Sequence, residues 1–231
     1  MLILPRVVGH RGACAHAPEN TLASFAKAAD LGCAMVEFDV RLSADGVPVV
    51  FHDDMLERRT NGRGPVGRLT AAQLARLDAG AGEPVPTLAQ VLALCAARGL
   101  GVNMEIKPDR GAGDATARAA LAVARAQWGG APPLVSSFDF AALDAARDAA
   151  PDWPRSLLLE RVPGHWAELA RRFGCAAIGA HHRALPAVLV AQLNTAGLAV
   201  MAYTVNRPGR ARRLWQRGVA AVFCDAPDRL L

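Results

Sequence analysis

Two histidines stand at the ends of short apolar segments. His10 closes the segment Val7–His10, and His52 closes the segment Val47–His52. The imidazole side chain has an ordinary pKa of about 6.5, so near neutral pH one histidine can accept a proton while a second donates one. We therefore interpret His10 and His52 as a candidate acid–base pair.

Three carboxylates lie inside two other apolar segments. Glu37 and Asp39 stand two residues apart within Met35–Val40, and Glu105 lies within Val102–Ile106. Residues two apart on a strand point to the same face, so Glu37 and Asp39 are expected side by side. Carboxylates among apolar residues repel one another and are costly to bury unless a cation joins them. Three oxygen ligands favour a hard divalent cation, Mg²⁺ or Ca²⁺, and the residues do not distinguish the two.

Two basic residues accompany the carboxylates. Arg11 follows His10, and Lys107 stands two residues after Glu105. Cations beside a metal site suggest an anion between them, for which a phosphoryl group is the natural candidate. Two histidines, a metal and two cations together describe a site that cleaves a phosphodiester. The alternative is a structural ion-pair cluster, in which the carboxylates only neutralise Arg11, Arg41 and Lys107.

The elements that carry these residues alternate along the chain between strand-like and helix-like segments. This alternation requires a parallel sheet, and eight units in 231 residues suit a closed (β/α)₈ TIM barrel, an α/β fold whose active site lies where the strands end. An open doubly wound sheet is the second choice, but its Gly-x-Gly-x-x-Gly turn is absent. The expected strands are residues 7–10, 35–40, 102–106, 134–138, 156–159, 176–180, 200–205 and 221–224. The expected helices are residues 20–31, 69–77, 88–97, 114–127, 140–149, 165–173, 185–196 and 208–217.

One strand-like segment, Val47–His52, does not fit the alternation. It follows the second strand too closely for a parallel crossover, and Asp45-Gly46 is a strong hairpin signal. We therefore expect a β-hairpin excursion after strand 2, with antiparallel register bringing His52 beside Asp39. The Gly- and Pro-rich residues 58–86 are then an elaborated connection rather than a second domain.

The composition supports one folded domain over residues 1–231. Hydrophobic residues make up 52% of the chain, which excludes disorder. The net charge of +5 is spread along the chain and aromatic residues are only 5%, so we expect no nucleic-acid partner. Without an apolar run of about 18 residues, no stable membrane insertion is expected. Five scattered cysteines and no secretory leader predict a cytoplasmic protein, and its oligomeric state stays open.

The ordered motifs resemble those of the glycerophosphodiester phosphodiesterase family, above all its compact bacterial cytosolic type. Each motif is weak by itself, whereas the ordered set spans almost the whole chain. The motifs are His-Arg-Gly (10–12), Pro-Glu-Asn-Thr (18–21), Glu-Phe-Asp-Val (37–40), Asp-Gly-Val-Pro-Val-Val-Phe-His-Asp (45–53), Asn-Gly (61–62), Pro-Thr-Leu (86–88), Glu-Ile-Lys (105–107), Ser-Ser-Phe (136–138), Tyr-Thr-Val-Asn (203–206) and Asp-Ala-Pro-Asp (225–228).

The resemblance implies a barrel that hydrolyses deacylated phospholipids. The implied substrates are small glycerophosphodiesters such as glycerophosphocholine and glycerophosphoethanolamine, and the products are sn-glycerol 3-phosphate and an alcohol. The attacking group is either metal-bound water or the substrate's own glycerol 2-hydroxyl, which would form a cyclic phosphate. The implied site residues are Glu37, Asp39 and Glu105 on a divalent metal, His10 and His52 as acid and base, and Arg11 and Lys107 on the phosphate.

Other polar and aromatic residues also stand at strand ends. Phe138 and Tyr203 are interpreted as lining the glycerol or alcohol pocket, with core packing as the alternative. Asp225 is a candidate for supporting the site, while His181 and His182 have no assigned role. Two other functions stay open: a phosphodiesterase acting on lysophospholipids, which would need an apolar interfacial element, and a non-catalytic barrel that binds phosphate.

Overall fold

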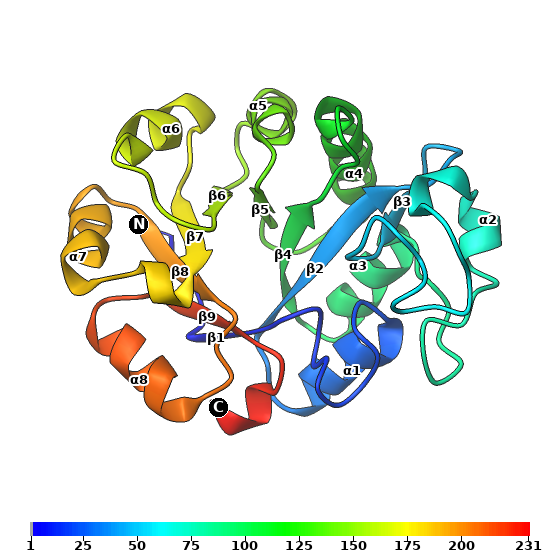
Figure 1. Ribbon diagram of the computed structural model, residues 1–231, viewed down its shortest axis with the longest axis horizontal. Helices are drawn as coiled ribbons and strands as arrows, with labels where there is room; N and C mark the ends of the chain where they lie inside the picture. Colours follow the sequence, from blue (N-terminus) through cyan, green and yellow to red (C-terminus); the bar gives the residue numbers. More distant parts are fainter. Residues whose placement is uncertain (1) are drawn as a thin grey trace.

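Eight parallel strands close into a barrel that is surrounded by helices in the computed structural model, which describes residues 2–231 (Figure 1). The strands follow one another around the barrel almost in chain order, as the (β/α)₈ prediction requires. They are β1 (Val7–Gly9), β2 (Met35–Leu42), β4 (Gly101–Ile106), β5 (Leu134–Ser137), β6 (Arg155–Leu159), β7 (Ala177–His181), β8 (Ala199–Tyr203) and β9 (Ala221–Cys224), while β3 (Pro48–Val50) lies outside the barrel.

The barrel is closed by its first strand. Gly9 of β1 pairs in parallel with Val36 of β2, and Val7 of the same strand pairs with Val222 of β9. Because β1 has a neighbour on both sides, the sheet has no open edge at this point, which excludes the doubly wound alternative. The TIM-barrel prediction is therefore confirmed.

The helices begin where the sequence supplies a cap. Thr21, Thr87 and Asp139 each accept a hydrogen bond from the first turn of the helix that follows. Among residues 2–231, no helix is both long and apolar enough to cross a membrane. The helices are α1 (Leu22–Asp30), α2 (Ala71–Leu74), α3 (Leu88–Ala97), α4 (Gly113–Gln127), α5 (Phe140–Ala149), α6 (Trp166–Phe173), α7 (Ala187–Thr195) and α8 (Pro208–Gln216).

The expected hairpin joins β2 to β3, but its register differs by one residue from the prediction. Val40 pairs with Val50, and the amide of Phe51 donates to the carbonyl of Asp39 at 2.9 Å. Phe51, not His52, therefore stands opposite Asp39, and His52 follows at the start of the next loop. The one-residue difference arises because the loop from Leu42 to Pro48 is longer than a two-residue turn.

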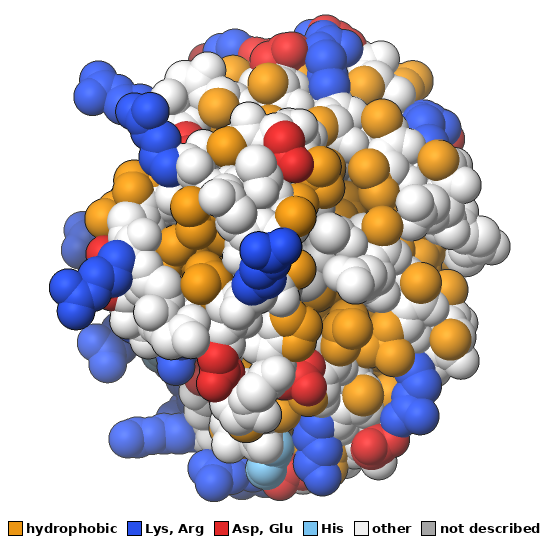
Figure 2. All heavy atoms as spheres, turned by 90° about the vertical axis from the view of Figure 1, so that its right-hand side faces the viewer, with side chains coloured by type: hydrophobic (Ala, Val, Ile, Leu, Met, Phe, Trp, Pro, Cys, Tyr) orange, Lys and Arg blue, Asp and Glu red, His pale blue; other side chains and the backbone are white. Residues whose placement is uncertain are grey.

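The connection between β3 and α3 has a small core of its own. Leu56, Val66 and Leu74 are fully buried there, packed against Val49 and Phe51 of the hairpin. The predicted helix at 69–77 is wrong in length, because only α2 is helical and the rest follows the irregular packing of this cluster. This side of the molecule is seen in Figure 2, where cationic and anionic side chains lie between scattered apolar ones.

The alternation along β2 separates the core from the polar interior. Phe38 packs outward against α1, where its ring meets the Phe25 ring edge-on at 5.7 Å between centroids. On the opposite face, Met35 joins an apolar cluster with Met201 and Phe223 that fills the barrel interior. Glu37 and Asp39 lie further along the same inward face, toward the carboxyl ends of the strands. The barrel is thus apolar inside near the start of its strands and polar at their ends.

Candidate active site

A pocket of about 240 Å³ opens at the carboxyl ends of the barrel strands, where TIM-barrel enzymes carry their active sites. All nine residues that the sequence singled out line it, together with others it did not. The lining residues are His10, Arg11, Glu37, Asp39, His52, Asn103, Glu105, Lys107, Phe138, Leu158, Glu160, Tyr203, Thr204 and Phe223.

Glu37, Asp39 and Glu105 form a compact acidic cluster. One oxygen from each carboxylate lies within 4.8 Å of the others. Burial and the nearby Asp39 charge raise the pKa of Glu105 to about 8, and burial with both neighbouring carboxylates raises the pKa of Glu37 well above its usual range. Carboxylates that repel one another in this way have the oxygen donors that a divalent cation prefers.

A second observation fits a polar group in this pocket. Asn103 lines the pocket and is 1% exposed, yet within residues 2–231 neither side-chain polar atom of Asn103 has a hydrogen-bond partner. Buried amides are normally satisfied by protein, water or a bound group. The acidic cluster and the unsatisfied Asn103 therefore fit a metal ion with its accompanying ligands.

The pKa of Glu105 predicts how pH affects the stability of the metal-free protein. The folded-state pKa of about 8 exceeds the ordinary glutamate pKa of 4.5, so folding favours the protonated form. This stabilisation is complete below about pH 4.5 and is lost as pH rises towards about 8.

In EDTA, the melting temperature of the wild type is expected to fall over this pH range, whereas that of Glu105→Gln is expected to stay nearly constant. Excess Mg²⁺ is expected to oppose the fall, because metal binding requires the ionised carboxylates. A wild-type profile in EDTA as flat as that of Glu105→Gln would contradict the prediction.

Asp39 differs from its two acidic neighbours. Burial alone would raise the pKa of Asp39, but the charges of Arg11 and Lys107 outweigh it and hold that pKa below its usual range. The side-chain amide of Asn20 donates to Asp39 at 2.8 Å. Asn20 belongs to the Pro-Glu-Asn-Thr motif, of which Thr21 caps α1. The motif therefore both begins a helix and orients a carboxylate of the cluster.

Arg11 lies between acidic groups on a strained turn. Its amide donates to Glu37 at 3.0 Å, and its guanidinium contacts Glu19 at 2.9 Å and Asp39 at 3.5 Å. Its φ of 51° is in the left-handed region. The turn continues through Gly12, where an added Cβ would lie 2.6 Å from the backbone carbon of Ser24. Only glycine fits this close approach to α1, so the His-Arg-Gly motif is also a packing requirement.

His52 is held by a carboxylate on one side and faces a cation on the other. Its Nδ1 lies 2.6 Å from Asp53, which Arg58 contacts in turn, and its Nε2 lies 2.5 Å from Nζ of Lys107. With a proton on Nδ1 for Asp53, Nε2 carries the lone pair of the ring and accepts from Lys107 in this structure. Burial lowers the pKa of His52, and Arg11 and Lys107 add to this effect. His52 is therefore suited to accepting a proton near neutral pH.

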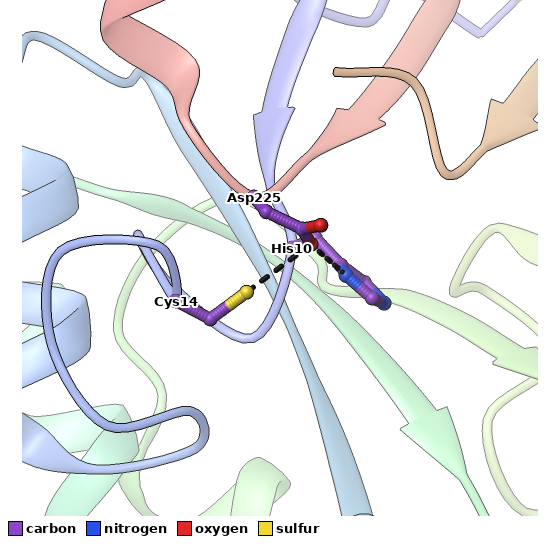
Figure 3. Close-up of side chains that lie close together, drawn as sticks. All are labelled: His10, Cys14 and Asp225. Carbon is purple, nitrogen blue, oxygen red and sulfur yellow. Dashed lines mark hydrogen bonds and ion pairs between the residues drawn. The ribbon is translucent and has the colours of Figure 1, made fainter.

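His10 has the same arrangement, with a partner from the other end of the chain. Its Nδ1 lies 2.6 Å from Asp225 (Figure 3). Its Nε2 lies 4.0 Å from Glu37. Two hydrogen bonds join Asn206 to Asp225: the Asn206 side-chain amide donates to the Asp225 carboxylate at 2.6 Å, and the backbone amide of Asp225 donates to Oδ1 of Asn206 at 2.9 Å. Asp225 therefore fixes the orientation of His10 and is itself fixed.

Cys14 is the third side chain of this group. Its thiol donates to the same oxygen of Asp225 at 3.1 Å, as Figure 3 shows. Burial raises the pKa of Cys14 far above its usual range, with the Asp225 charge adding to the shift. A thiol held in its protonated form is a poor nucleophile, so Cys14 serves here as a hydrogen-bond donor.

Replacing Asp225 with asparagine is expected to lower kcat by about tenfold to a hundredfold, with little change in KM. The amide can no longer stabilise a protonated His10 by its charge, although the shape of the group is kept. Steady-state kinetics with a glycerophosphodiester would measure the effect. Asp228→Asn is the matched control, because Asp228 also lies 2.6 Å from a histidine, His16, but outside the pocket. Equal effects of the two variants would contradict a role for Asp225 in orienting His10.

Two aromatic side chains form one wall of the pocket. The rings of Phe138 and Tyr203 meet edge-on at 5.8 Å, and the Tyr203 hydroxyl donates to the carbonyl of Leu159 at 2.8 Å. Phe138 is 41% exposed, which is unusual for a side chain whose role is core packing. The arrangement favours the pocket-lining interpretation over the packing one.

The sequence missed several residues of the site. Glu160, Asn103 and Asn206 were not singled out. Glu160 and Asn206 follow the ends of β6 and β8, so position relative to a strand end was the available signal for them, whereas Asn103 lies in the middle of β4. Asn206, however, acts through Asp225, and their contact depends on how β8 and β9 lie side by side.

Solved structures resemble this one over its whole length. An Oleispira antarctica phosphodiesterase, determined in complex with the product sn-glycerol 3-phosphate, is 37% identical with a TM-score of 0.96, covering 98% of this chain and 95% of that one. A glycerophosphodiester phosphodiesterase from Agrobacterium tumefaciens is 28% identical with a TM-score of 0.83, covering 98% and 99%. Together, the barrel, its site and these relatives define an enzyme that hydrolyses phosphoric diesters.

The sequence comparisons narrow this class to one family. Residues 10–229 match the sequence model of the glycerophosphoryl diester phosphodiesterase family. A glycerophosphodiester phosphodiesterase of Caldanaerobacter subterraneus subsp. tengcongensis is 30% identical, over 97% of this chain and 96% of that protein. The chain belongs to the glycerophosphoryl diester phosphodiesterase family, as its motifs suggested.

Proposed function

We propose that the protein hydrolyses deacylated phospholipids such as glycerophosphocholine and glycerophosphoethanolamine to sn-glycerol 3-phosphate and an alcohol. The observation that carries the proposal is the convergence of two histidines, two cations and three carboxylates on one pocket. The Oleispira antarctica relative, which binds sn-glycerol 3-phosphate, supports the identity of the product. Residues 1–231 act as one domain in this proposal.

Glu37, Asp39 and Glu105 would hold Mg²⁺ or Ca²⁺ in the active enzyme. The bound ion would act as a Lewis acid toward a phosphate oxygen and lower the negative charge on the phosphorus. The support for this is the oxygen-only donor set, with its mutual repulsion, and the unsatisfied Asn103 beside it.

The chain's own residues bind the phosphate and move protons. Lys107, whose Nζ lies 3.7 Å from Asp39, and Arg11 on the other side of the same carboxylate would pair with the phosphoryl oxygens. One histidine would deprotonate the attacking hydroxyl or water, and the other would protonate the leaving alkoxide. Both Nδ1 atoms contact carboxylates, which leaves Nε2 of each ring for these transfers.

A cytoplasmic location completes the proposal. All five cysteines are free thiols, and three of them, Cys33, Cys95 and Cys224, are buried. Free thiols are typical of a reducing compartment.

The direct test is an assay of glycerol 3-phosphate release from glycerophosphocholine, with and without EDTA. Release that stops in EDTA and returns with Mg²⁺ or Ca²⁺ is expected. Release that persists in EDTA would contradict the metal site, while failure on every glycerophosphodiester by the folded protein would contradict the substrate class. Lysophosphatidylcholine is the comparison substrate, and preference for it would favour the lysophospholipid alternative.

A further inference from the structure

A second and larger cavity adjoins the active-site pocket. This cleft, of about 780 Å³, is lined by residues of the segments that follow β7 and β8 and lead into α7 and α8; Figure 1 shows these segments side by side. Thr204 lines both cavities, so the two are adjacent at the end of β8. The charged and titratable residues of the cleft are His182, Arg183, Arg207, Arg210, Arg213 and Arg217.

Four of these arginines form a row along α8. Arg207, Arg210 and Arg213 are three residues apart, and Arg217 follows four residues later, so all lie on one helix face over roughly 15 Å. Within residues 2–231, none of the four, nor Arg183, forms an ion pair with a carboxylate. By contrast, several arginines elsewhere on the surface, such as Arg118 and Arg172, contact an aspartate.

This arrangement is unfavourable in the absence of an anion. Like charges three or four residues apart destabilise a helix, and basic residues in its first turn oppose the helix dipole. Burial, together with the charges of Arg217, Arg213 and Arg183, lowers the pKa of Arg210. An anion bound at the start of α8 would relieve both effects, since its negative charge would lie among the guanidinium groups and at the positive end of the helix dipole.

Arg210 is oriented for such a contact. Its Nε donates to Nδ1 of His182 at 3.1 Å and its Nη2 donates to the His182 carbonyl, which holds the guanidinium at the wall of the cleft. His182, for which the sequence suggested no role, thereby joins α8 to the end of β7. The cleft is thus built from two consecutive βα units.

The cleft is linked to the reaction centre through two residues. Thr204 lies at the boundary of both cavities, and Asn206 lines the cleft while holding Asp225, the partner of His10. A substrate whose phosphodiester lies at His10 therefore has the cleft next to it. Since the glycerol half is common to all the proposed substrates, the half that varies is the alcohol.

We propose that the arginine cleft binds a further phosphate group on the alcohol half of the substrate, so that the enzyme prefers glycerophosphodiesters whose alcohol is itself phosphorylated. This inference rests on the proposed function. Guanidinium groups bind phosphate by paired, charge-assisted hydrogen bonds, which a choline or ethanolamine cation cannot accept. Single-stranded nucleic acid fits less well, because no Phe, Tyr or Trp lines the cleft among the described residues to stack on bases.

The test compares two substrates that differ by one phosphate, glycerophosphoinositol and glycerophosphoinositol 4-phosphate. Wild-type kcat/KM is expected to be about tenfold higher for the phosphorylated substrate. The double variant Arg207→Gln/Arg213→Gln is expected to lose this preference while turning over glycerophosphoinositol within about twofold of wild type. Arg68→Gln/Arg76→Gln, which removes the same charge from two exposed arginines outside the cleft, is the matched control and is expected to keep the preference.

The outcomes separate this inference from the proposed function. Equal kcat/KM for the two substrates in the wild type, or an equal loss of kcat/KM on both substrates in the cleft variant, would overturn the inference while leaving the proposed function intact.

If no glycerophosphodiester is cleaved, the proposed function fails, and calorimetric binding of inorganic pyrophosphate then tests the cleft alone. Weaker pyrophosphate binding in the cleft variant than in the control would support an anion site. Loss of binding to anionic phospholipid vesicles, with an unchanged substrate ratio, would show a membrane contact and overturn the inference.

Discussion

Replacing His52 with alanine is expected to lower kcat for glycerophosphocholine by about a hundredfold to ten-thousandfold, with KM changed much less. The size of the effect on kcat follows from the loss of a positioned acid–base group. The effect on KM is small because the proposed phosphate ligands, Arg11 and Lys107, are unchanged. Burial and two neighbouring cations lower the pKa of His52, so the wild-type residue is a neutral base over most of the physiological range.

The reason for choosing His52 is its set of contacts. Asp53 lies 2.6 Å from Nδ1 of His52 and orients the ring. Nζ of Lys107, a proposed phosphate ligand, lies 2.5 Å from Nε2 of the same ring. Alanine removes the proton acceptor but leaves the loop and its Asp53–Arg58 pair in place. The fold should therefore survive, which a melting curve would verify.

His165→Ala is the matched control for this experiment. His165 is exposed at the start of α6 and lies outside the pocket, so its replacement is expected to leave kcat within about twofold of wild type. A His52→Ala enzyme with near wild-type kcat would remove His52 from the reaction. It would also leave the short contact with Lys107 without a catalytic meaning.

Replacing Glu105 with glutamine is expected to have opposite effects on activity and on the stability of the metal-free protein. Activity should fall by about a hundredfold or more, because the proposed metal would lose one of its three anionic ligands. In EDTA at pH 8, the variant should melt at a higher temperature than wild type. The physical reason is that glutamine removes the buried Glu105 charge, which Asp39 repels. The pKa of about 8 for the Glu105 carboxyl group shows that its ionisation is costly in this pocket.

This pair of effects distinguishes a metal site from a structural ion-pair cluster. If the carboxylates only neutralised Arg11, Arg41 and Lys107, removing one would leave a buried cation without its partner and lower the melting temperature. Added Mg²⁺ or Ca²⁺ should raise the melting temperature of wild type more than that of the variant, in proportion to the lost affinity. A variant less stable than wild type in EDTA, with an unchanged response to metal, would contradict the metal site.

Glu160→Gln is the control for this second experiment. Glu160 lines the same pocket but is exposed and lies outside the acidic cluster. Its replacement removes an equal charge from the pocket wall, so a general electrostatic effect on substrate binding would appear in both variants. Only the Glu105 variant is expected to change the response of the melting temperature to metal.

The sequence alone determined the barrel and most of its site, because the relevant signals are local. Alternation along Met35–Leu42 places Glu37 and Asp39 on one face whatever surrounds them, and Asp45-Gly46 predicts the return of the chain. In a barrel of parallel strands, residues at strand ends converge without further information. All nine predicted residues therefore meet in one pocket. The resemblance to the family added the substrate class, which no local pattern contains.

Only the tertiary structure decided which distant residues meet. His10 and Asp225 are 215 positions apart, and their contact depends on β1 closing the barrel against β9. The register that puts Phe51 opposite Asp39 depends on how the loop between β2 and β3 packs. The hairpin signal predicts the turn, but it does not determine the register to the exact residue. The basic residues are spread along the whole chain in the sequence. The geometry of α8, however, places four of its arginines on one face, and with Arg183 they line a cleft beside the active site. Contacts of this kind follow from the packing of whole elements, and no short stretch of sequence specifies them.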